Sequence, residues 1–331
     1  MVLVEIAAGG ETGVGWTYAD LSAATLIESR FVKLLAGHDA MSISAAWAKM
    51  LRDIRNVGRP GVAATAISAV DNALWDLKAK LLGLPLVNLL GRVRDAVLVY
   101  GSGAFTSYAP ERLRQQLGGW AEEGMRFVKM KVGRDAAADR ERVRVAKKAI
   151  GDCALFVDAN GAYTRKLALA QAEHFAESDV RWFEEPVGSD DLDGLRLIRD
   201  RAPAGMDIAA GEYGYDHYYF RRMLVAGAVD VLQADATRCC GITGFLRASA
   251  LCESFNLALS SHCAPSMHLH VGCAALPLVH LEYFHDHVRI ESMLFDGFCA
   301  ARDGVVRPDL TRPGHGLELK RKDAEKYAVS F

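Results

Sequence analysis

Residues 156–163 read FVDANGAY, an apolar run that ends on Asp158 and gives way to a polar turn containing glycine. Glu184 in WFEEPV and Glu212 in IAAGEYG follow apolar runs of the same kind, 26 and then 28 residues further along (158, 184, 212). Such an interval holds one strand and one helix, and an unbroken apolar run is typical of a strand buried on both faces of a parallel sheet. The stretch therefore predicts repeated β–α units, each with an acid at the carboxyl end of its strand.

The same rhythm extends along the chain in both directions. Lys131 lies 27 residues before Asp158, and further ionisable residues follow the third acid at intervals of 23, 27 and 20 residues: Asp235, His262 and Glu282. In a closed parallel barrel the carboxyl ends of all strands meet at one rim. The pattern therefore predicts an α/β fold with an eight-stranded (β/α) barrel. The runs assigned to its strands, from near Leu98 onward, are VLVYGSGAF, FVKMKV, ALFVD, RWFEE, DIAAGE, VLQAD, LALSS and LVHLE.

The composition restricts the class of protein and its partners. A chain of 331 residues exceeds a typical single domain and suits a barrel of roughly 200 to 250 residues with a smaller companion domain. Lys and Arg number 39 against 41 Asp and Glu, and 51% of the residues are hydrophobic. This balance provides no basic surface for nucleic acid and favours a small-molecule partner.

The cysteines and the N-terminus indicate a compartment. Seven cysteines are an odd number, and they show no CxxC pairs of the kind that bind zinc, so we expect reduced thiols that serve in packing. The N-terminus has no basic region followed by an apolar core, and no apolar run approaches the roughly 18 residues of a membrane helix. We therefore expect a cytoplasmic protein without a membrane partner.

The chain divides into three parts. Residues 1–95 open with VLVEIA and VGWT around a glycine-rich turn, which predicts a β-hairpin, and continue with helical periodicity. The barrel is expected over residues 96–297. Residues 298–331 turn polar and are expected to leave the barrel and rejoin the front domain. The helices expected in the front domain span about residues 24–35, 42–55 and 63–82.

Six short motifs occur in a fixed order at barrel spacing: KMK at 129–131, D-x-N at 158–160, EEP at 184–186, GE at 211–212, QAD at 233–235 and SSH at 260–262. Together they resemble the enolase superfamily, in the order of its mandelate racemase-like branch. The resemblance extends from about Val2 to the C-terminus. It implies an N-terminal α+β capping domain, a modified TIM barrel, and Mg²⁺ bound by three acids on successive strands.

The chemistry of these residues agrees with the resemblance. Removing the proton α to a carboxylate places a second negative charge on the substrate, and this charge requires a strong local cation. Three hard oxygen ligands suit Mg²⁺ and leave coordination positions for substrate and water. Asp158, Glu184 and Glu212 are the ligands expected.

A lysine pair provides the expected base. Lys129 and Lys131 are two residues apart on a strand, so their side chains share one face. Two adjacent ammonium groups lower each other's pKa, which predicts that one can act as a neutral base. By resemblance, Lys131 is that base and Lys129 its electrostatic neighbour.

A second acid–base group is expected across the pocket. His262 can serve in this role if Asp235, from the preceding strand, fixes its tautomer and raises its basicity. The resemblance also implies that Glu282 is protonated and donates a hydrogen bond to a substrate carboxylate. Asn160 would support the ligand set without binding the metal itself.

Several neighbouring residues have simpler interpretations. Glu185 is expected to be an ion-pair partner and not a ligand. His268 and His270 either line the pocket or, as for most histidines, are packed or exposed. The tyrosines expected near the rim, where each can touch substrate, are Tyr163, Tyr213 and Tyr215.

The chain also departs from the family pattern. Relatives commonly have a strand and a closing loop ahead of VLVEIA, and this chain opens directly on the hairpin. A misplaced start codon, a truncation, or closure of the site by another subunit would each explain this. An unpaired strand edge invites partner contacts, so we expect a homo-oligomer. Cys240 stands where relatives often have glycine, a change expected to alter packing more than chemistry.

Two classes of function are compatible with these residues. The first is a Mg²⁺-dependent enzyme that abstracts the proton α to a carboxylate, most plausibly an acid-sugar dehydratase that forms a 2-keto-3-deoxy acid. An α-hydroxy-acid racemase would use the same Lys131 and His262, whereas a muconate-cycloisomerase-like role would place a lysine where this chain has Asp235. The second class is a non-catalytic metal-binding relic.

Overall fold

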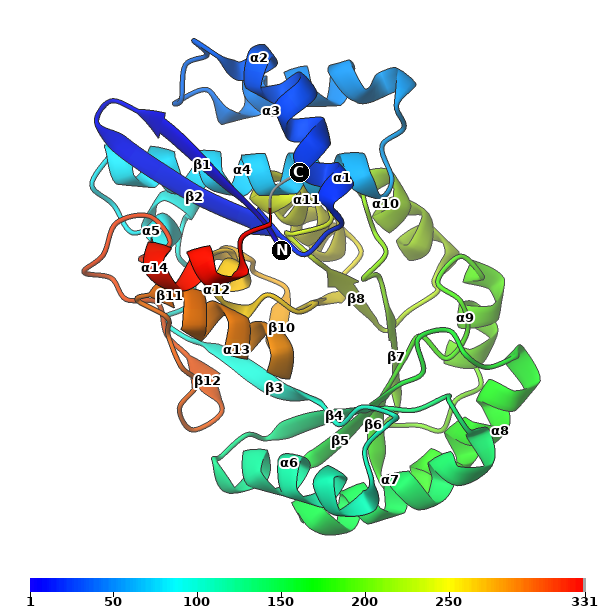
Figure 1. The fold of residues 1–331 in the computed structure, drawn as a ribbon. Helices are drawn as coiled ribbons and strands as arrows, with labels where there is room; N and C mark the ends of the chain where they lie inside the picture. Colours follow the sequence, from blue (N-terminus) through cyan, green and yellow to red (C-terminus); the bar gives the residue numbers. More distant parts are fainter. Residues whose placement is uncertain (330–331) are drawn as a thin grey trace.

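The computed structural model of the protein describes residues 1–329. Its largest part is a barrel in which consecutive parallel strands are neighbours and β10 pairs with β3 to close the ring (Figure 1). The predicted modified TIM barrel with an N-terminal capping domain is confirmed. The barrel strands are β3 (Val97–Gly103), β4 (Phe127–Lys131), β5 (Ala154–Asp158), β6 (Val180–Glu184), β7 (Asp207–Ala210), β8 (Val231–Ala234), β9 (Ala258–Ser261) and β10 (Leu278–Phe284).

Each barrel strand is followed by a helix that covers the outside of the barrel (Figure 1). Local signals start several of them: the Asp135 side chain accepts hydrogen bonds from two amides of the first turn of α7, and Asp216 caps α10. The helices are α6 (Pro110–Glu122), α7 (Ala136–Ile150), α8 (Arg165–Ala176), α9 (Leu192–Arg199), α10 (His217–Ala226), α11 (Gly241–Ser254), α12 (Pro265–Ala274) and α13 (His285–Leu294).

The strand register places the acids above a floor of aromatic rings. Phe156 and Trp182 are partners on β5 and β6, and their rings stack with centroids 5.1 Å apart. Two residues further along, Asp158 and Glu184 are partners in the same way. Because side chains at i and i+2 share a face of a strand, the acids point into the barrel on the same side as the rings. Buried aromatic packing therefore holds the metal-ligating residues from below.

The capping domain begins with a hairpin of β1 (Val2–Ala8) and β2 (Glu11–Thr17), which packs on the long helix α4 (Val62–Leu81). A Cβ at Gly15 would lie 2.3 Å from the backbone nitrogen of Ala73, so glycine is required for this close approach. Within residues 1–329 this sheet has two strands, as expected. Its other helical segments are α1 (Leu21–Leu26), the π-turn η1 (Ile27–Phe31), α2 (Val32–Leu35), α3 (Ile43–Asp53), the 3₁₀ turn η2 (Ile54–Asn56) and α5 (Leu86–Leu90).

Polar side chains of α4 join the capping domain to the barrel. They accept hydrogen bonds from three successive backbone amides at the start of α11, next to the loop that follows β8. All three side chains are buried, so losing any of them leaves an amide without a partner. The bonds are Gly241 N to Ser68 Oγ (3.0 Å), Ile242 N to Asn72 Oδ1 (3.0 Å) and Thr243 N to Asp71 Oδ2 (2.9 Å).

The C-terminal segment contacts both parts of the molecule. The amide of His315 donates to buried Asp76 of α4 at 2.7 Å, and Arg321 contacts Glu5 of the hairpin at 2.6 Å. The domain bounds 1–95, 96–297 and 298–331 stay predictions. The elements of this segment are β11 (Phe295–Asp296), β12 (Val305–Val306), β13 (Glu318–Leu319), α14 (Arg321–Ala324) and the 3₁₀ turn η3 (Glu325–Tyr327).

None of the helices within residues 1–329 combines the length and the apolar character needed to cross a bilayer.

Candidate metal and acid–base site

Three acids converge at the carboxyl ends of β5, β6 and β7. Asp158 and Glu184 are the last residues of their strands, and Glu212 follows β7 by two residues. Each offers a carboxylate oxygen, and these oxygens lie within 4.8 Å of one another. All three side chains are buried, and within the described chain Glu212 Oε2 has no hydrogen-bond partner. The sequence-predicted ligand set is thus brought together, with an oxygen left free to bind a cation.

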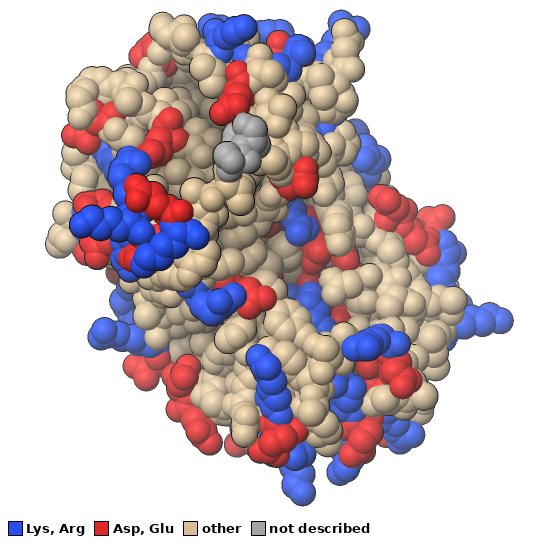
Figure 2. All heavy atoms as spheres, viewed as in Figure 1, with Lys and Arg blue, Asp and Glu red and all other residues tan. Residues whose placement is uncertain are grey.

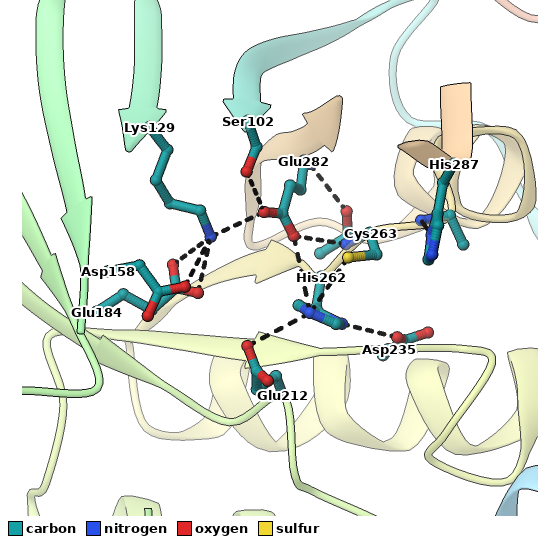
Figure 3. A network of polar contacts seen from close by, with 12 residues as sticks. Ser102, Lys129, Asp158, Glu184, Glu212, Asp235, His262, Cys263, Glu282 and His287 are labelled. Carbon is teal, nitrogen blue, oxygen red and sulfur yellow. Dashed lines mark hydrogen bonds and ion pairs between the residues drawn. The ribbon is translucent and has the colours of Figure 1, made fainter. Parts of the chain in front are cut away.

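The two lysines of β4 face these acids, as Figure 3 shows for Lys129. Lys129 is fully buried, and its Nζ donates to both carboxylate oxygens of Glu184 at 2.7 Å. Lys131 lies nearer the mouth, and its Nζ donates to Asp158. Both side chains therefore point to the acid side of the barrel, as the alternation along the strand predicts.

The expected mutual lowering of the lysine pKa values is not what this structure shows. Burial alone would lower the pKa of Lys131, but the Asp158 carboxylate outweighs burial and the Lys129 charge, so the pKa stands above its usual value. The pKa of Lys129 is likewise raised, because Glu184 and Glu282 outweigh its burial. The prediction counted the lysines and omitted the more numerous carboxylates around them.

His262 and Asp235 form the expected pair. His262 Nδ1 lies 2.8 Å from Asp235 Oδ2, and this bond outweighs burial to lower the pKa of Asp235. The ionised carboxylate fixes the proton on Nδ1 and leaves Nε2 facing the acids, 3.3 Å from Glu212 Oε2 (Figure 3). Cys263 adds a thiol 3.2 Å from the same Nε2.

Glu282 is placed at the site, but its predicted protonation is wrong in this structure. Its carboxylate accepts hydrogen bonds from Ser102 Oγ at 2.6 Å and from the Cys263 amide at 2.7 Å, and it lies 2.8 Å from Lys129 Nζ (Figure 3). Burial would raise the pKa of Glu282, but Lys129 and His262 lower it well below its usual range. A carboxylate surrounded by donors is ionised and accepts hydrogen bonds.

Glu185 is not the ion-pair partner that was expected. Its side chain is 1% exposed and, among the residues described, its Oε1 has no hydrogen-bond partner. Burial and the negative charges of Glu212 and Asp158 raise its pKa to about 10. The sequence signal failed because no cation stands next to it, and the adjacent acids repel its charge.

Other predicted neighbours fall into two groups. Asn160 supports a ligand as expected, since its amide donates to Asp158 Oδ1 at 2.8 Å. His268 and His270 are buried and hydrogen-bonded to backbone, so they are packing residues. Tyr163 is also buried, and its hydroxyl donates to Asp139 at 2.6 Å, away from the rim. The tyrosines that do lie at the rim are Tyr213 and Tyr215.

Two site residues were missed in the sequence. Arg238, three residues after Asp235, donates to the backbone oxygen of Glu212 at 3.2 Å and lies over the Tyr213 ring. Ser102 is the register partner of Lys129 on β3. Extending the 27-residue rhythm one further step back from Lys129 leads to Ser102 (129 − 27), so this residue was within reach of the pattern.

Cys240 shows where the chain departs from glycine. Its backbone has φ +69°, in the left-handed region that favours glycine, and its carbonyl accepts a hydrogen bond from Trp47 Nε1 at 2.9 Å. Its side chain packs in the core of the capping domain. The site is thus undisturbed, although its effect on chemistry stays a prediction.

The arrangement defines a class of protein. A set of three hard carboxylates with an unpartnered oxygen fits Mg²⁺, and the adjacent lysines and His–Asp pair supply proton-transfer groups on a (β/α) barrel. Two family profiles match the chain: "Mandelate racemase / muconate lactonizing enzyme, N-terminal domain" over residues 1–91, and "Enolase C-terminal domain-like" over residues 112–324. The chain belongs to the mandelate racemase/muconate lactonizing enzyme family of the enolase superfamily, and it is an enzyme of that superfamily.

Named relatives cover nearly the whole chain. The 3,6-anhydro-alpha-L-galactonate cycloisomerase of Streptomyces coelicolor is 34% identical, over 97% of this chain and 89% of its own. The L-talarate/galactarate dehydratase of Salmonella typhimurium is 33% identical, over 89% of this chain and 74% of its own.

Solved structures agree with the fold. A mandelate racemase/muconate lactonizing enzyme-like protein from Rubrobacter xylanophilus is 54% identical, with a TM-score of 0.97 over 99% of this chain and 91% of its own. A racemase from Streptomyces coelicolor, solved with bound magnesium, is 32% identical, with a TM-score of 0.92 over 99% and 92%.

Proposed function

We propose that this enzyme dehydrates an acid sugar to a 2-keto-3-deoxy acid. The observation that carries the proposal is the position of Lys131 on β4 and His262 after β9, with the three acids between them. Around the closed barrel, four strands separate β4 from β9 on one side and two on the other. A substrate held by its carboxylate at the acids would therefore meet one proton-transfer group from each side.

Lys131 is proposed to remove the proton α to the substrate carboxylate. Its Nζ lies at the mouth side of the acids, and Lys129 beneath it adds a fixed positive charge near the carboxylate that must accept a second negative charge. When bound, Mg²⁺ would offset the acid charge that holds the proton on Lys131 and would stabilise the enediolate.

His262 is proposed to assist the departure of the β-hydroxyl. Asp235 holds Nδ1–H, so a second proton on Nε2 can be delivered to the leaving oxygen as the enediolate collapses to an enol. The enol then becomes the 2-keto acid. Glu282, held by Ser102 and the Cys263 amide, fixes the position of Lys129.

The relatives support an acid sugar as the substrate class. Four of those found are named as dehydratases, of L-talarate/galactarate, D-gluconate, arabinonate and L-rhamnonate. Structures of L-talarate/galactarate dehydratase and L-talarate dehydratase contain Mg and L-glucarate. We infer Asp158, Glu184 and Glu212 as the residues that hold Mg²⁺ in this chain.

The proposal is tested with a panel of mono- and dicarboxylate sugars and Mg²⁺. A 2-keto acid, detected by its semicarbazone, is expected from at least one member of the panel, and chelation by EDTA should abolish its formation. Removal of the α-proton without loss of hydroxide would exclude dehydration and favour the racemase alternative.

A second candidate is cycloisomerisation of an acid sugar. The relative that matches 97% of this chain bears that name, as does D-galactarolactone cycloisomerase. The same Lys131 and His262 would act, with a ring oxygen as the leaving group in place of a hydroxyl. An anhydro-sugar acid that is consumed while simple acid sugars are inert would favour this reaction.

The surface and edge strands suggest the partners. Figure 2 shows acidic and basic side chains interspersed on the viewed face, which agrees with a partner that is not nucleic acid. We infer a homo-oligomer, because within residues 1–329 β1 pairs on one edge only. The cytoplasmic location stays a prediction.

A further inference from the structure

A cavity of about 560 Å³ lies beside the carboxylate cluster, a size in the usual range for ligand sites. Its inner wall consists of sequence neighbours of the three metal-ligating acids. Asn160 stands two residues after Asp158, while Glu185 and Tyr213 each follow the next acid directly. The cavity therefore continues outward from the place where the substrate carboxylate would bind.

Glu185 is the most unusual part of this wall. It is a buried side chain with an unpartnered Oε1 among the residues described, and its backbone has φ +39°, in the left-handed region. Two backbone bonds hold this conformation: its amide donates to Ala209 O at 2.9 Å, and its carbonyl accepts from Gly161 N at 2.8 Å. A buried polar atom without a partner costs free energy. Strain and an unmatched oxygen at a cavity wall together indicate a group that waits for a ligand.

The remaining polar groups of the cavity suit hydroxyl ligands. Tyr213, Tyr215 and Tyr219 line it, and the Tyr219 hydroxyl donates to Ser189 O at 3.3 Å. A phenol can both donate and accept a hydrogen bond, as can a sugar hydroxyl. Tyrosine rings also supply apolar surface for the C–H faces of a sugar chain.

The charges of the cavity oppose a second carboxylate. Three acids line it, Glu185, Asp190 and Asp216, against Arg222 as the one cation among the described lining residues. Asp216 already pairs with Arg59 at 3.2 Å, so this arginine is engaged. A ligand carboxylate placed here would face like charges, an arrangement that costs several kcal/mol.

We propose that this cavity binds the uncharged, hydroxyl-bearing end of a monocarboxylate sugar acid and discriminates against diacids. The inference rests on the proposed function, since the substrate carboxylate must bind at the three acids for its other end to enter the cavity. It separates this enzyme from the relatives that act on dicarboxylates.

The test compares mono- and diacids of matched configuration, such as gluconate with glucarate and galactonate with galactarate. Calorimetry with the Mg²⁺-loaded Lys131→Ala/His262→Asn variant measures binding without turnover. We expect the preferred monoacid to bind at least about tenfold more tightly than its diacid partner. Equal or tighter binding of the diacids, or no binding of any monoacid, would overturn the inference. Failure of the proposed chemistry is seen separately, as the absence of 2-keto acid from all sugars with the wild-type enzyme.

Two variants test the cavity itself. Ser189→Arg adds a cation at the rim and should shift the monoacid-to-diacid affinity ratio about tenfold towards the diacid. Glu185→Leu should weaken monoacid binding about tenfold while Mg²⁺ binding persists. Glu177→Leu, at an exposed acid next to the C-terminus of α8, is the matched control and should leave the ratio unchanged. An unchanged ratio in Ser189→Arg would contradict the proposal even if Glu185→Leu fails to fold.

Discussion

Lys131 and His262 are individually assignable because each can reach only one face of a bound Cα. Proton transfer requires hydrogen-bond reach, and a substrate fixed by its carboxylate cannot turn over between the two groups. In deuterated water, Lys131→Ala should abolish α-proton exchange for one configuration and leave it measurable for the other. His262→Asn should do the reverse. The measurement is NMR of the recovered sugar acids.

The control for this experiment is the binding of Mg²⁺, which both variants should retain, since neither residue is one of the three acids. If both variants lose exchange for both configurations while they still bind the ion, the opposed-base arrangement is wrong. One of the two residues would then act only by positioning the other groups.

Glu212 has the clearest test among the proposed ligands, because its Oε2 has no partner among the described residues. Glu212→Gln keeps the shape of the side chain and removes its charge. We expect Mg²⁺ affinity and turnover to fall together, each by about 100-fold or more, since a hard dication depends on its anionic ligands. Calorimetric titration with Mg²⁺ measures the first effect. Unchanged affinity in this variant, with Glu177→Gln as the reference, would remove Glu212 from the ligand set.

At the scale of elements, the strand ends could be predicted from the sequence, because buried parallel strands leave continuous apolar runs and the interval between them is nearly constant. The charges of the site could not. The pKa values of Lys131, Glu185 and Glu282 depend on which groups lie within a few ångströms, and these come from strands far apart in the chain. The π-turn at Ile27–Phe31 was also missed, since the periodicity on both sides of it is helical.

Helix α4 carries a titratable group that joins it to the barrel. Asp71 is fully buried and accepts from Thr243, and burial raises its pKa from 3.8 to about 7 despite these bonds. Below about pH 4 the group is protonated in both the folded and unfolded states. Between about pH 4 and 7 only the unfolded state loses the proton, so stability falls as pH rises, by about 1.4 kcal/mol per pH unit.

Asp71→Asn should therefore be less sensitive to pH than the wild type. The difference in unfolding free energy between the two proteins, from urea titrations at pH 5 and pH 8, should move in favour of the variant at the higher pH. Asp95→Asn, at an exposed acid, is the control and should track the wild type. A difference that does not change with pH would mean that Asp71 ionises normally in the folded protein.

At the scale of the whole molecule, the free edge of β1 has the features of an assembly surface. The edge borders a hollow of about 430 Å³ lined mainly by apolar side chains, including Ile6 of β1, Phe31 of η1 and Leu74 of α4. An unpaired strand beside apolar surface readily accepts another chain. We expect sedimentation at micromolar concentration to give a species larger than the 36.0 kDa monomer.

The variant Ile6→Lys tests whether this edge carries the assembly, because a charge on an edge strand opposes pairing with a second chain. Its sedimentation coefficient should fall towards that of the monomer, with the folded state retained by circular dichroism. Val225→Lys is the matched control, since Val225 is 63% exposed on α10 at the outside of the barrel. A wild-type protein that sediments as a monomer would refute the expectation of an oligomer. An assembly that persists in Ile6→Lys would place the interface on another face of the molecule.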